Sequence, residues 1–183
     1  GVTMDDLLNT KIKVASSSPL TQRESPSILT VITEEEIRNT GARDMTDLLN
    51  LVPGFNFAND IDGVVGVSMR GMWANEGKML MLIDGQEIPE LVFNGLQWIG
   101  RYNISEIKRI EIIRGPGSAL YGGNAELGVI NIITKQGRDI NGISVNTTYG
   151  QMTKMTGRRT VDIAAGKKLE DLEFSLTGQI GDG

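Results

Sequence analysis

Short apolar runs separated by polar segments dominate the first three quarters of the chain, and they predict strands. SILTVI (27–32) is rich in β-branched residues, and four further runs have the same character. We therefore expect strands at 27–32, Val64–Met69, Lys78–Ile83, Ile107–Ile113 and Val129–Ile133. The third of these runs into Asp84-Gly85, a dipeptide typical of a two-residue hairpin turn.

Two short helices are expected between the first two strands. Thr33 and Glu36 have the spacing of a capping box, so the first helix should begin after Thr33 and end at Gly41. Asp44 is the expected N-cap of a second helix at about 45–51, which stops before a Pro-Gly pair.

Long irregular segments lie between the expected strands. They are FANDIDG (57–63), WANEG (73–77) and PELVFNGLQWIG (89–100). Segments this long within a small domain are usually functional or mobile. Residues 26–135 therefore read as an α+β domain with a mixed four-stranded sheet, short helices and long loops, preceded by a flexible arm at 1–25.

After residue 136 the hydrophobic pattern changes to alternation of apolar and polar positions. The segments GISVNTTYG (142–150), TVDIAAG (160–166) and LEFSLTGQI (172–180) each place their apolar residues on one face. Such segments suit half-buried antiparallel strands, including those of outer-membrane barrels. A β-meander of a soluble domain has the same pattern. Three strands do not close a barrel, so we expect 136–183 to be the start of a larger sheet.

Composition removes several classes of chemistry. The chain of 183 residues has neither Cys nor His, which excludes disulfides, thiolate nucleophiles and imidazole bases. Its formal net charge of −5 argues against a nucleic-acid partner. Neighbouring acids such as Asp60 and Asp62 remain as candidate calcium ligands, but the terminal Glu of a calcium loop is missing. An exposed turn is the alternative.

The stretch IEIIRGPGSALYGGNAELGVINIITK (110–135) raises the question of a phosphate-binding loop. Gly117 and Gly122 have the separation of a Walker loop, but Gly123-Asn124 stand where Lys-Ser/Thr is needed. The dinucleotide pattern fails as well, since Leu120 occupies its third glycine position. These glycines therefore indicate close backbone approach and positive φ rather than phosphate binding.

Five motifs in one order resemble the plug domain of TonB-dependent outer-membrane receptors. They are SPSILTVITEEEIRNTGARDMTDLLNLVPGF, VSMRGM, MLMLIDGQEI, ISEIKRIEIIRGP and IRGPGSALYGGNAELGVINIITK. The resemblance spans residues 4–135, and residues 136–183 then resemble the first three strands of the family's barrel, the rest of which is missing. It implies a plug that fills the lumen of a barrel of about 22 strands.

The resemblance also implies function and location. The parent would be a non-enzymatic outer-membrane transporter that imports a siderophore, haem, cobalamin or glycan, with no cofactor. Its plug would lie in the barrel lumen and its N-terminal arm would face the periplasm. The C-terminal domain of TonB, with ExbB and ExbD behind it, would deliver energy by pairing with a short strand of that arm.

The residues that match the TonB-binding segment are Lys11, Ile12, Lys13, Val14 and Ala15. The family's segment is usually more apolar and is often preceded by an acid. A plain linker strand is therefore the alternative.

Plug-barrel contacts are implied for Arg70 and Arg114, which match arginines that face acidic groups of the barrel wall. Gly115, Tyr121 and Gly122 belong to the same signature. Because the matching barrel strands lie outside this chain, we expect both arginines to lack their carboxylates. Local pairing of each arginine is the alternative.

Ligand contacts are implied for the outward-pointing loops of the plug. The matching residues are Asn59, Asp60, Asp62, Trp73, Asn75, Glu76, Phe93, Asn94 and Trp98. Large apolar side chains in loops are typical of a binding apex. A position in the core is the alternative for Trp98.

Three other functions remain open. A signalling receptor of the same architecture would carry a further N-terminal domain. A soluble plug-like binding protein would have to bury the apolar face of 142–180, and an enzyme would need acid or base groups that the pattern does not offer. The fragment itself is expected to be soluble and to self-associate through residues 142–180, whose strand edges are open.

Overall fold

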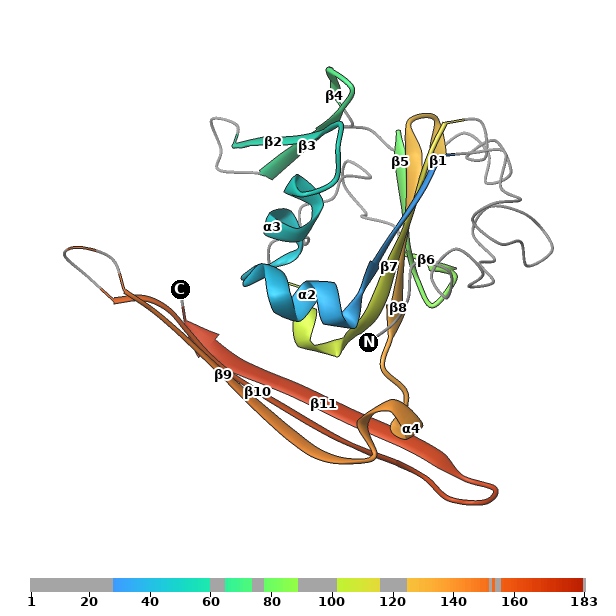
Figure 1. Ribbon diagram of the computed structural model, residues 1–183, viewed down its shortest axis with the longest axis vertical. Helices are drawn as coiled ribbons and strands as arrows, with labels where there is room; N and C mark the ends of the chain where they lie inside the picture. The colour runs from blue at the N-terminus through green and yellow to red at the C-terminus, as the bar shows by residue number, and fades with distance from the viewer. Residues whose placement is uncertain are drawn as a thin grey trace. The chain divides into compact units, whose positions relative to one another are not determined.

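The computed structural model describes residues 28–59, 65–73, 78–88, 102–115, 125–151, 153 and 156–182 (Figure 1). The chain divides into two units, residues 1–104 with 108–133, and residues 105–107 with 134–183. The first unit contains the two helices and the mixed sheet expected from the sequence. The second contains three long antiparallel strands.

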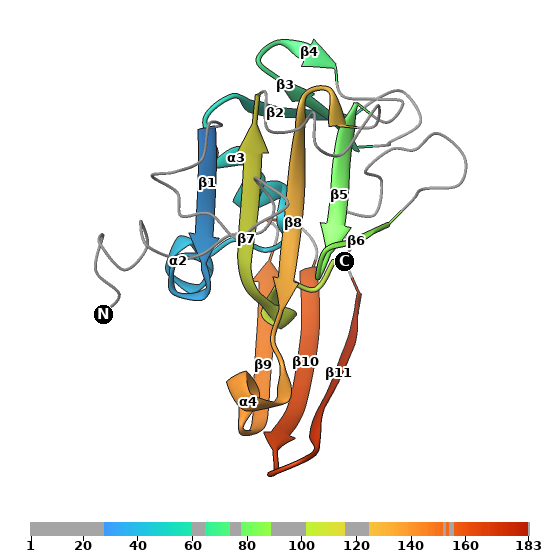
Figure 2. The same ribbon diagram turned by 90° about the vertical axis from the view of Figure 1, so that its right-hand side faces the viewer.

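The main sheet of the first unit has the order β1-β7-β8-β5-β6 (Figure 2). Its members are β1 (Ile28–Thr33), β7 (Ile107–Arg114), β8 (Gly128–Thr134), β5 (Met79–Ile83) and β6 (Gln86–Glu87). β1 is antiparallel to β7, whereas β5 is parallel to β8. The expected mixed sheet is confirmed, with the two-residue β6 added after the Asp84-Gly85 turn.

Both faces of this sheet are covered, which explains why its central strands are rich in apolar residues rather than strictly alternating. One cluster joins Leu29, Leu80, Leu82, Ile113 and Val129 together with Ala125. Further side chains of the two central strands are equally buried, namely Ile110, Ile112, Ile130 and Ile132. Since neighbouring residues of a strand point to opposite faces, this burial requires packing on both sides.

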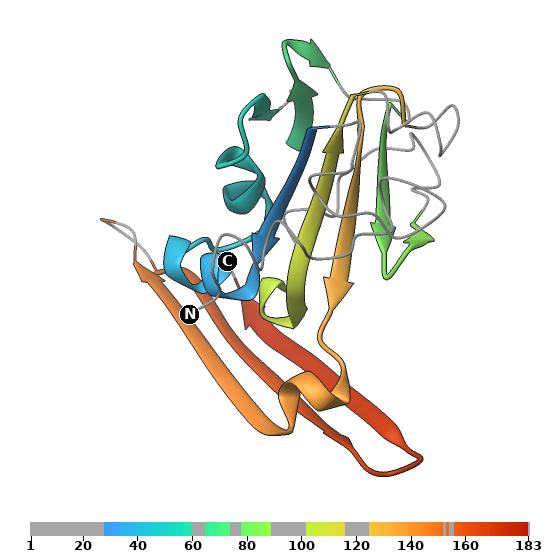
Figure 3. The same cartoon turned by 45° about the vertical axis from the view of Figure 1, so that its right-hand side comes forward.

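Helices α2 (Glu34–Thr40) and α3 (Met45–Asn50) lie on the same side of the sheet (Figures 1 and 3). The expected capping box is confirmed: Glu36 N–H donates to Thr33 Oγ1 at 3.3 Å, and Thr33 N–H donates to Glu36 Oε2 at 2.7 Å. α2 ends at Gly41 in the left-handed conformation. Asp44 caps α3 through the N–H of Asp47 at 3.0 Å.

A second sheet of the first unit differs from the expectation. β2 (Phe55–Asn59), β3 (Val65–Met69) and β4 (Met72–Trp73) form an antiparallel sheet apart from the main one. The segments 57–63 and 73–77 were expected as loops, but both begin inside strands. The reason is pairing at a distance, because β2 finds its hydrogen bonds on β3.

Two glycines of the 110–135 stretch are required for different reasons. Gly115 has φ +109, and a Cβ added there would meet no atom within 4 Å, so its backbone conformation alone requires glycine. Gly128 is the reverse case. A Cβ there would lie 2.6 Å from the carbonyl oxygen of Ile113, so close strand packing requires glycine. Both expected uses of glycine therefore occur, positive φ at Gly115 and close backbone approach at Gly128.

The second unit begins with a helical turn, α4 (Gly137–Ile140), and continues with β9 (Gly142–Gln151), β10 (Thr156–Lys168) and β11 (Glu173–Asp182). A 3-10 turn, Ile104–Glu106, also contributes, since Lys135 N–H donates to the Glu106 carbonyl at 2.8 Å. The three strands follow the expected order and form an antiparallel meander. They run longer than the alternating segments suggest, because β10 includes Lys167 and Lys168.

Within the described ranges, no helix has the length and apolar content needed to cross a membrane.

Candidate functional site

The β9–β10–β11 sheet has one apolar and one polar face. Residues paired across antiparallel strands point to the same face, so the register assigns each side chain. Val145 pairs with Ile163, and Val161 pairs with Ile180. The apolar face carries Ile143, Val145, Tyr149, Val161, Ile163, Ala165, Phe174, Leu176 and Ile180. All of its large members are exposed.

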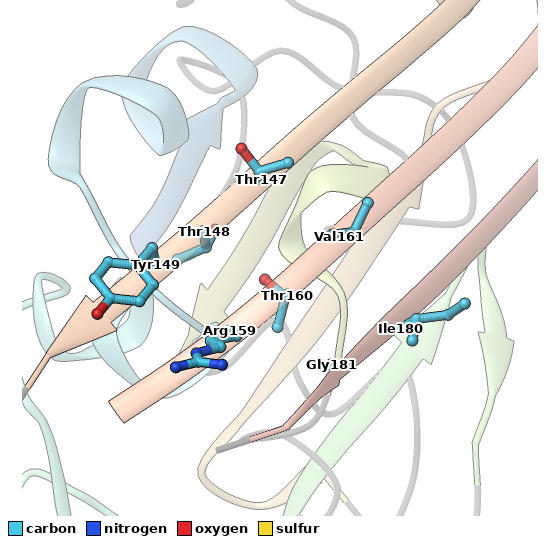
Figure 4. A pocket seen from close by; sticks show the side chains of 8 residues that line it. All are labelled: Thr147, Thr148, Tyr149, Arg159, Thr160, Val161, Ile180 and Gly181. Carbon is cyan, nitrogen blue, oxygen red and sulfur yellow. The ribbon is translucent and has the colours of Figure 1, made fainter. Parts of the chain in front are cut away.

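Each end of this apolar face is marked by one aromatic and one basic residue. Tyr149 pairs with Arg159 at one end (Figure 4), and Phe174 pairs with Lys167 at the other. The distance from Arg159 to Lys167 along β10 is about 27 Å at ~3.4 Å per residue. With the ~40° tilt of barrel strands this gives ~20 Å along the membrane normal, close to the ~25 Å apolar band of outer-membrane barrels.

The opposite face of the same sheet is polar and internally bonded. Gln179 Nε2 donates to Asp162 Oδ1 at 2.6 Å, between β11 and β10. α4 is attached to β11 by the ion pair of Arg138 Nη2 with Glu173 Oε2, at 3.0 Å. A sheet that is apolar on one side and hydrogen-bonded on the other is suited to separate hydrocarbon from a polar interior.

Arg114 and Arg70 place two positive charges near one another in the first unit. Arg114 donates from Nη2 to Thr30 Oγ1 at 2.8 Å and from Nη1 to the Pro53 carbonyl. Its Nε is buried without a hydrogen-bond partner. Arg70 follows Met69 in the tight turn between β3 and β4 with φ +52, and its N–H donates to the Gly54 carbonyl at 2.8 Å.

The pKa of Arg114 is lowered, first by burial of the guanidinium and second by repulsion from Arg70. Both effects oppose the charged form of the guanidinium. Neither effect is compensated by a carboxylate among the described residues. By contrast, the exposed Arg43 has a raised pKa because it hydrogen-bonds Asp47. Arg70 and Arg114 therefore bring two positive charges close together without a carboxylate partner among the described residues.

Trp73 is the one expected ligand contact whose side chain lies among the described residues. It belongs to β4, where it pairs with Ser68, and it is 41% exposed. Its six-membered ring covers Gly66, since a Cβ there would lie 2.0 Å from Cζ2 of the indole. Only glycine fits beneath the indole ring, which stays partly exposed.

Sequence reasoning missed a buried polar network inside the main sheet. Glu111 is 1% exposed; it accepts from Arg109 Nε at 2.8 Å and from Asn131 Nδ2 at 3.2 Å. Asn131 Oδ1 in turn accepts the Gly85 N–H at 3.1 Å. The signal was present, because Glu111 and Asn131 each interrupt an otherwise apolar strand run.

Several expected site residues lie outside the described residues. These are Lys11 to Ala15, Asp60, Asp62, Asn75, Glu76, Phe93, Asn94, Trp98, Tyr121 and Gly122. Of Asn59 the structure describes the backbone, at the end of β2. Their assigned roles stay predictions.

A small α+β domain followed by a sheet with one exposed apolar face fits the class of plugged outer-membrane barrels. Comparison with known families agrees. The model of the TonB-dependent Receptor Plug Domain family matches residues 21–129, more than half of the chain. The chain belongs to this family and carries the plug domain of a TonB-dependent outer-membrane receptor with the first barrel strands.

Two relatives illustrate the sequence similarity. An iron-regulated outer membrane virulence protein of Vibrio cholerae is 38% identical over 120 residues, which are 62% of this chain and 18% of the relative. The vitamin B12 transporter BtuB of Vibrio vulnificus is 35% identical over 123 residues, 66% of this chain and 20% of the relative. The chain thus spans about a fifth of the length of these curated relatives.

Solved structures show the same fold. The siderophore receptor PirA from Acinetobacter baumannii aligns with a TM-score of 0.66 and 27% identity, covering 84% of this chain and 24% of that one. A mutant of the ferric enterobactin receptor from Pseudomonas aeruginosa, in complex with enterobactin, aligns with a TM-score of 0.64 and 26% identity over the same shares.

Proposed function

We propose that this chain is the gating and ligand-sensing part of an outer-membrane active transporter that imports a ferric siderophore. The observation that carries the proposal is a plug fold continuous in sequence with a sheet whose apolar face is exposed. The names of the relatives support iron uptake, since an iron-regulated protein and siderophore receptors are among them. Cobalamin is the second candidate, favoured by the similarity to BtuB.

Energy enters through the N-terminal arm, residues 1–25. In this proposal the arm faces the periplasm, and Lys11 to Ala15 pair as a strand with the C-terminal domain of TonB, which ExbB and ExbD drive. Backbone hydrogen bonds provide the affinity in such strand addition, so a modestly apolar segment suffices.

The ligand meets the plug at its outward segments. Trp73 offers a partly exposed aromatic surface, whose ring packs directly over Gly66. Asn59, Asp60, Asp62, Asn75, Glu76, Phe93, Asn94 and Trp98 complete the proposed contacts. Large aromatic groups beside polar ones suit a ligand that is both flat and rich in hydrogen-bonding groups.

Arg70 and Arg114 hold the plug against acidic side chains of the barrel wall. The buried Nε of Arg114, which has no hydrogen-bond partner, supports this role, because a nearby carboxylate would offset the desolvation of the guanidinium. Gly115, Tyr121 and Gly122 lie in the adjoining signature. In this proposal residues 26–135 form the plug, 136–183 form barrel strands, and the role involves no catalysis.

Growth of a deletion strain tests the proposal. The gene that encodes this chain is deleted and restored with its native form, with a deletion of residues 11–15, or with a deletion of residues 16–20 as a matched control. Growth is measured on ferric siderophores, haem, cobalamin and glycans as limiting sources. Binding of the same ligands to isolated outer membranes is measured in parallel.

We expect the native gene and the 16–20 deletion to restore growth on a ferric siderophore. The 11–15 deletion should bind this ligand but fail to import it. Growth restored by the 11–15 deletion contradicts the TonB segment. Wild-type growth of the deletion strain on every source, with altered expression of an uptake operon, would instead indicate the signalling receptor.

A further inference from the structure

β3 and β4 form a hairpin whose two-residue turn consists of Arg70 and Gly71 (Figure 1). Both turn residues have positive φ, +52 at Arg70 and +78 at Gly71. A two-residue hairpin turn with this backbone favours Asn, Asp or Gly at its first position, so arginine is unfavourable there. A residue in such a conformation persists only where the surrounding structure holds it.

One support for Arg70 comes from Gly54, which immediately precedes β2. The Arg70 N–H donates to the Gly54 carbonyl at 2.8 Å. A Cβ added to Gly54 would lie 3.6 Å from Cγ of Arg70, so the aliphatic part of the arginine packs on this glycine. The preceding carbonyl, that of Pro53, accepts from Nη1 of Arg114. Two consecutive carbonyl groups thus contact both arginines.

A second support lies further along the hairpin, where the Trp73 indole covers Gly66. Trp73 pairs with Ser68, and its ring extends along β3 to Gly66. A Cβ at Gly66 would lie 2.0 Å from Cζ2 and 2.3 Å from Cη2 of the indole, so the ring can occupy this place only above a glycine. β4 consists of two residues, Met72 and Trp73, so its pairing with β3 depends strongly on this contact.

The charge on Arg70 makes a firmly held turn necessary. After burial, repulsion from Arg70 is the second cause of the lowered pKa of Arg114. Among the described residues, no carboxylate pairs with either guanidinium. Like charges that are free to move separate from each other, and Arg70 is exposed. The hairpin therefore has to hold the turn in place against this repulsion.

We propose that Gly66 and the Trp73 indole position Arg70: by fixing β4 on β3, they hold the turn in its unfavourable conformation beside Arg114. Gly66 and Trp73 are positioning residues in this inference, since they act on the contact between plug and barrel only through Arg70. The inference rests on the proposed function, in which Arg70 meets an acidic side chain of the barrel wall.

Amide hydrogen exchange of the 183-residue chain, followed by NMR in a non-denaturing detergent, tests the inference. Exchange of the Arg70 N–H reports its bond to the Gly54 carbonyl, and the amides of β7 and β8 report the stability of the first unit. Gly66→Ala forces the indole away from β3, whereas Trp73→Ala removes it. Gly178→Ala is the matched control, because its new methyl group meets no atom within 4 Å.

We expect Gly66→Ala and Trp73→Ala each to speed exchange of the Arg70 N–H about tenfold. Exchange in β7 and β8, and all exchange in Gly178→Ala, should change by less than about twofold. Unchanged exchange at Arg70, or an equal increase in β7 and β8, overturns the inference. If Gly66→Ala does not fold, Trp73→Ala decides by itself, since it removes atoms and adds none.

The double variant Gly66→Ala with Trp73→Ala shows whether the glycine acts through the ring. We expect its Arg70 exchange rate to match that of Trp73→Ala alone within about twofold, because without the indole the new methyl group meets nothing that it can displace. A double variant in which the two single effects multiply would mean that Gly66 acts independently of Trp73, and it would overturn the inference.

Uptake by the full-length receptor separates this inference from the proposed function. The deletion strain is restored with genes carrying Gly66→Ala, Arg70→Gln or both, and uptake of radioactive iron is measured at saturating ferric siderophore. Saturation removes any effect of Trp73 on ligand affinity. We expect the double variant to be no slower than Arg70→Gln alone, and a further loss contradicts positioning through Arg70. If no iron source requires the native gene, the proposed function fails, whereas amide exchange still decides whether Gly66 positions Arg70.

Discussion

Asn131 on β8 donates its side-chain amide to the buried carboxylate of Glu111 on β7, at 3.2 Å. The same Asn131 accepts the Gly85 N–H of the β5–β6 turn, so one side chain links three segments far apart in sequence. Glu111 is also paired with Arg109. A buried carboxylate is tolerated here because each of its oxygens has a donor.

Asn131→Leu should lower the free energy of unfolding of the first unit by about 2 kcal/mol, because it leaves the Gly85 N–H and one Glu111 oxygen without this partner. Both tryptophans, Trp73 and Trp98, belong to this unit, so their fluorescence in urea reports its unfolding. Asn56→Leu, at an exposed strand position, is the control and should stay within about 0.5 kcal/mol. Equal effects of the two changes would contradict the network.

Thr33→Ala should destabilise the same unit by about 1 kcal/mol, since it removes the acceptor for the Glu36 N–H and one half of the capping box. Thr33→Ser keeps a hydroxyl in the same place and should restore most of the loss. The measurement is the urea midpoint at constant slope. A Ser variant as unstable as the Ala variant would indicate that packing of the Thr methyl, not capping, matters.

Arg114→Met should leave the stability of this chain unchanged or raise it by up to ~1 kcal/mol. The guanidinium is partly desolvated and repelled by Arg70, and a flexible apolar side chain removes that cost. Arg43→Met, which breaks an exposed pair with Asp47, should instead lose about 0.3–0.5 kcal/mol. A loss above ~1 kcal/mol for Arg114→Met would show that its bonds to Thr30 and Pro53 outweigh the desolvation.

Gly128→Ala should destabilise the plug by about 1–3 kcal/mol, since the new methyl group would overlap the Ile113 carbonyl of the neighbouring strand. Gly115→Ala meets open space, so its cost of ~1 kcal/mol comes from backbone strain alone. Urea unfolding of both variants ranks them. The reverse order would mean that β7 and β8 separate more easily than close packing implies.

Val145→Asp should abolish self-association of the isolated chain, because it charges the apolar face of the β9–β10–β11 sheet. Ser144→Asp is the matched control: it lies next in sequence, at an exposed position of the polar face opposite Ala164, and adds the same charge. Sedimentation velocity over a range of concentrations distinguishes them. A native chain that stays monomeric, with a profile that removal of residues 136–183 does not simplify, would contradict the prediction.

Local signals in the sequence determined much of the first unit. The sequence predicted both N-caps, at Thr33 and Asp44, and the end of α2 at Gly41. The hydrogen bonds involved join residues only a few positions apart, so local sequence is sufficient to predict them. The β9, β10 and β11 strands were also readable, since alternation is a property of each strand by itself. The family resemblance, carried by five motifs, is confirmed by the match over residues 21–129.

Other structural features depended on contacts between segments far apart in the chain, which the sequence pattern does not identify. β2 was missed because Phe55–Asn59 becomes a strand only when β3 pairs with it. Gly66 shows no special pattern, yet the indole of Trp73 occupies the place of its missing side chain. The Glu111 network interrupts two apolar runs visibly, but which donors satisfy it depends on how three strands align.

The sequence by itself thus determined the helices, the alternating strands and the family, because each rests on interactions within a few residues or on a periodic pattern. Only the tertiary structure decided which strands pair, which glycine serves conformation and which serves packing, and how Arg114 comes to lie near Arg70. These depend on distances between segments far apart in the chain. Such distances are set by the packing of the whole unit and not by any one segment.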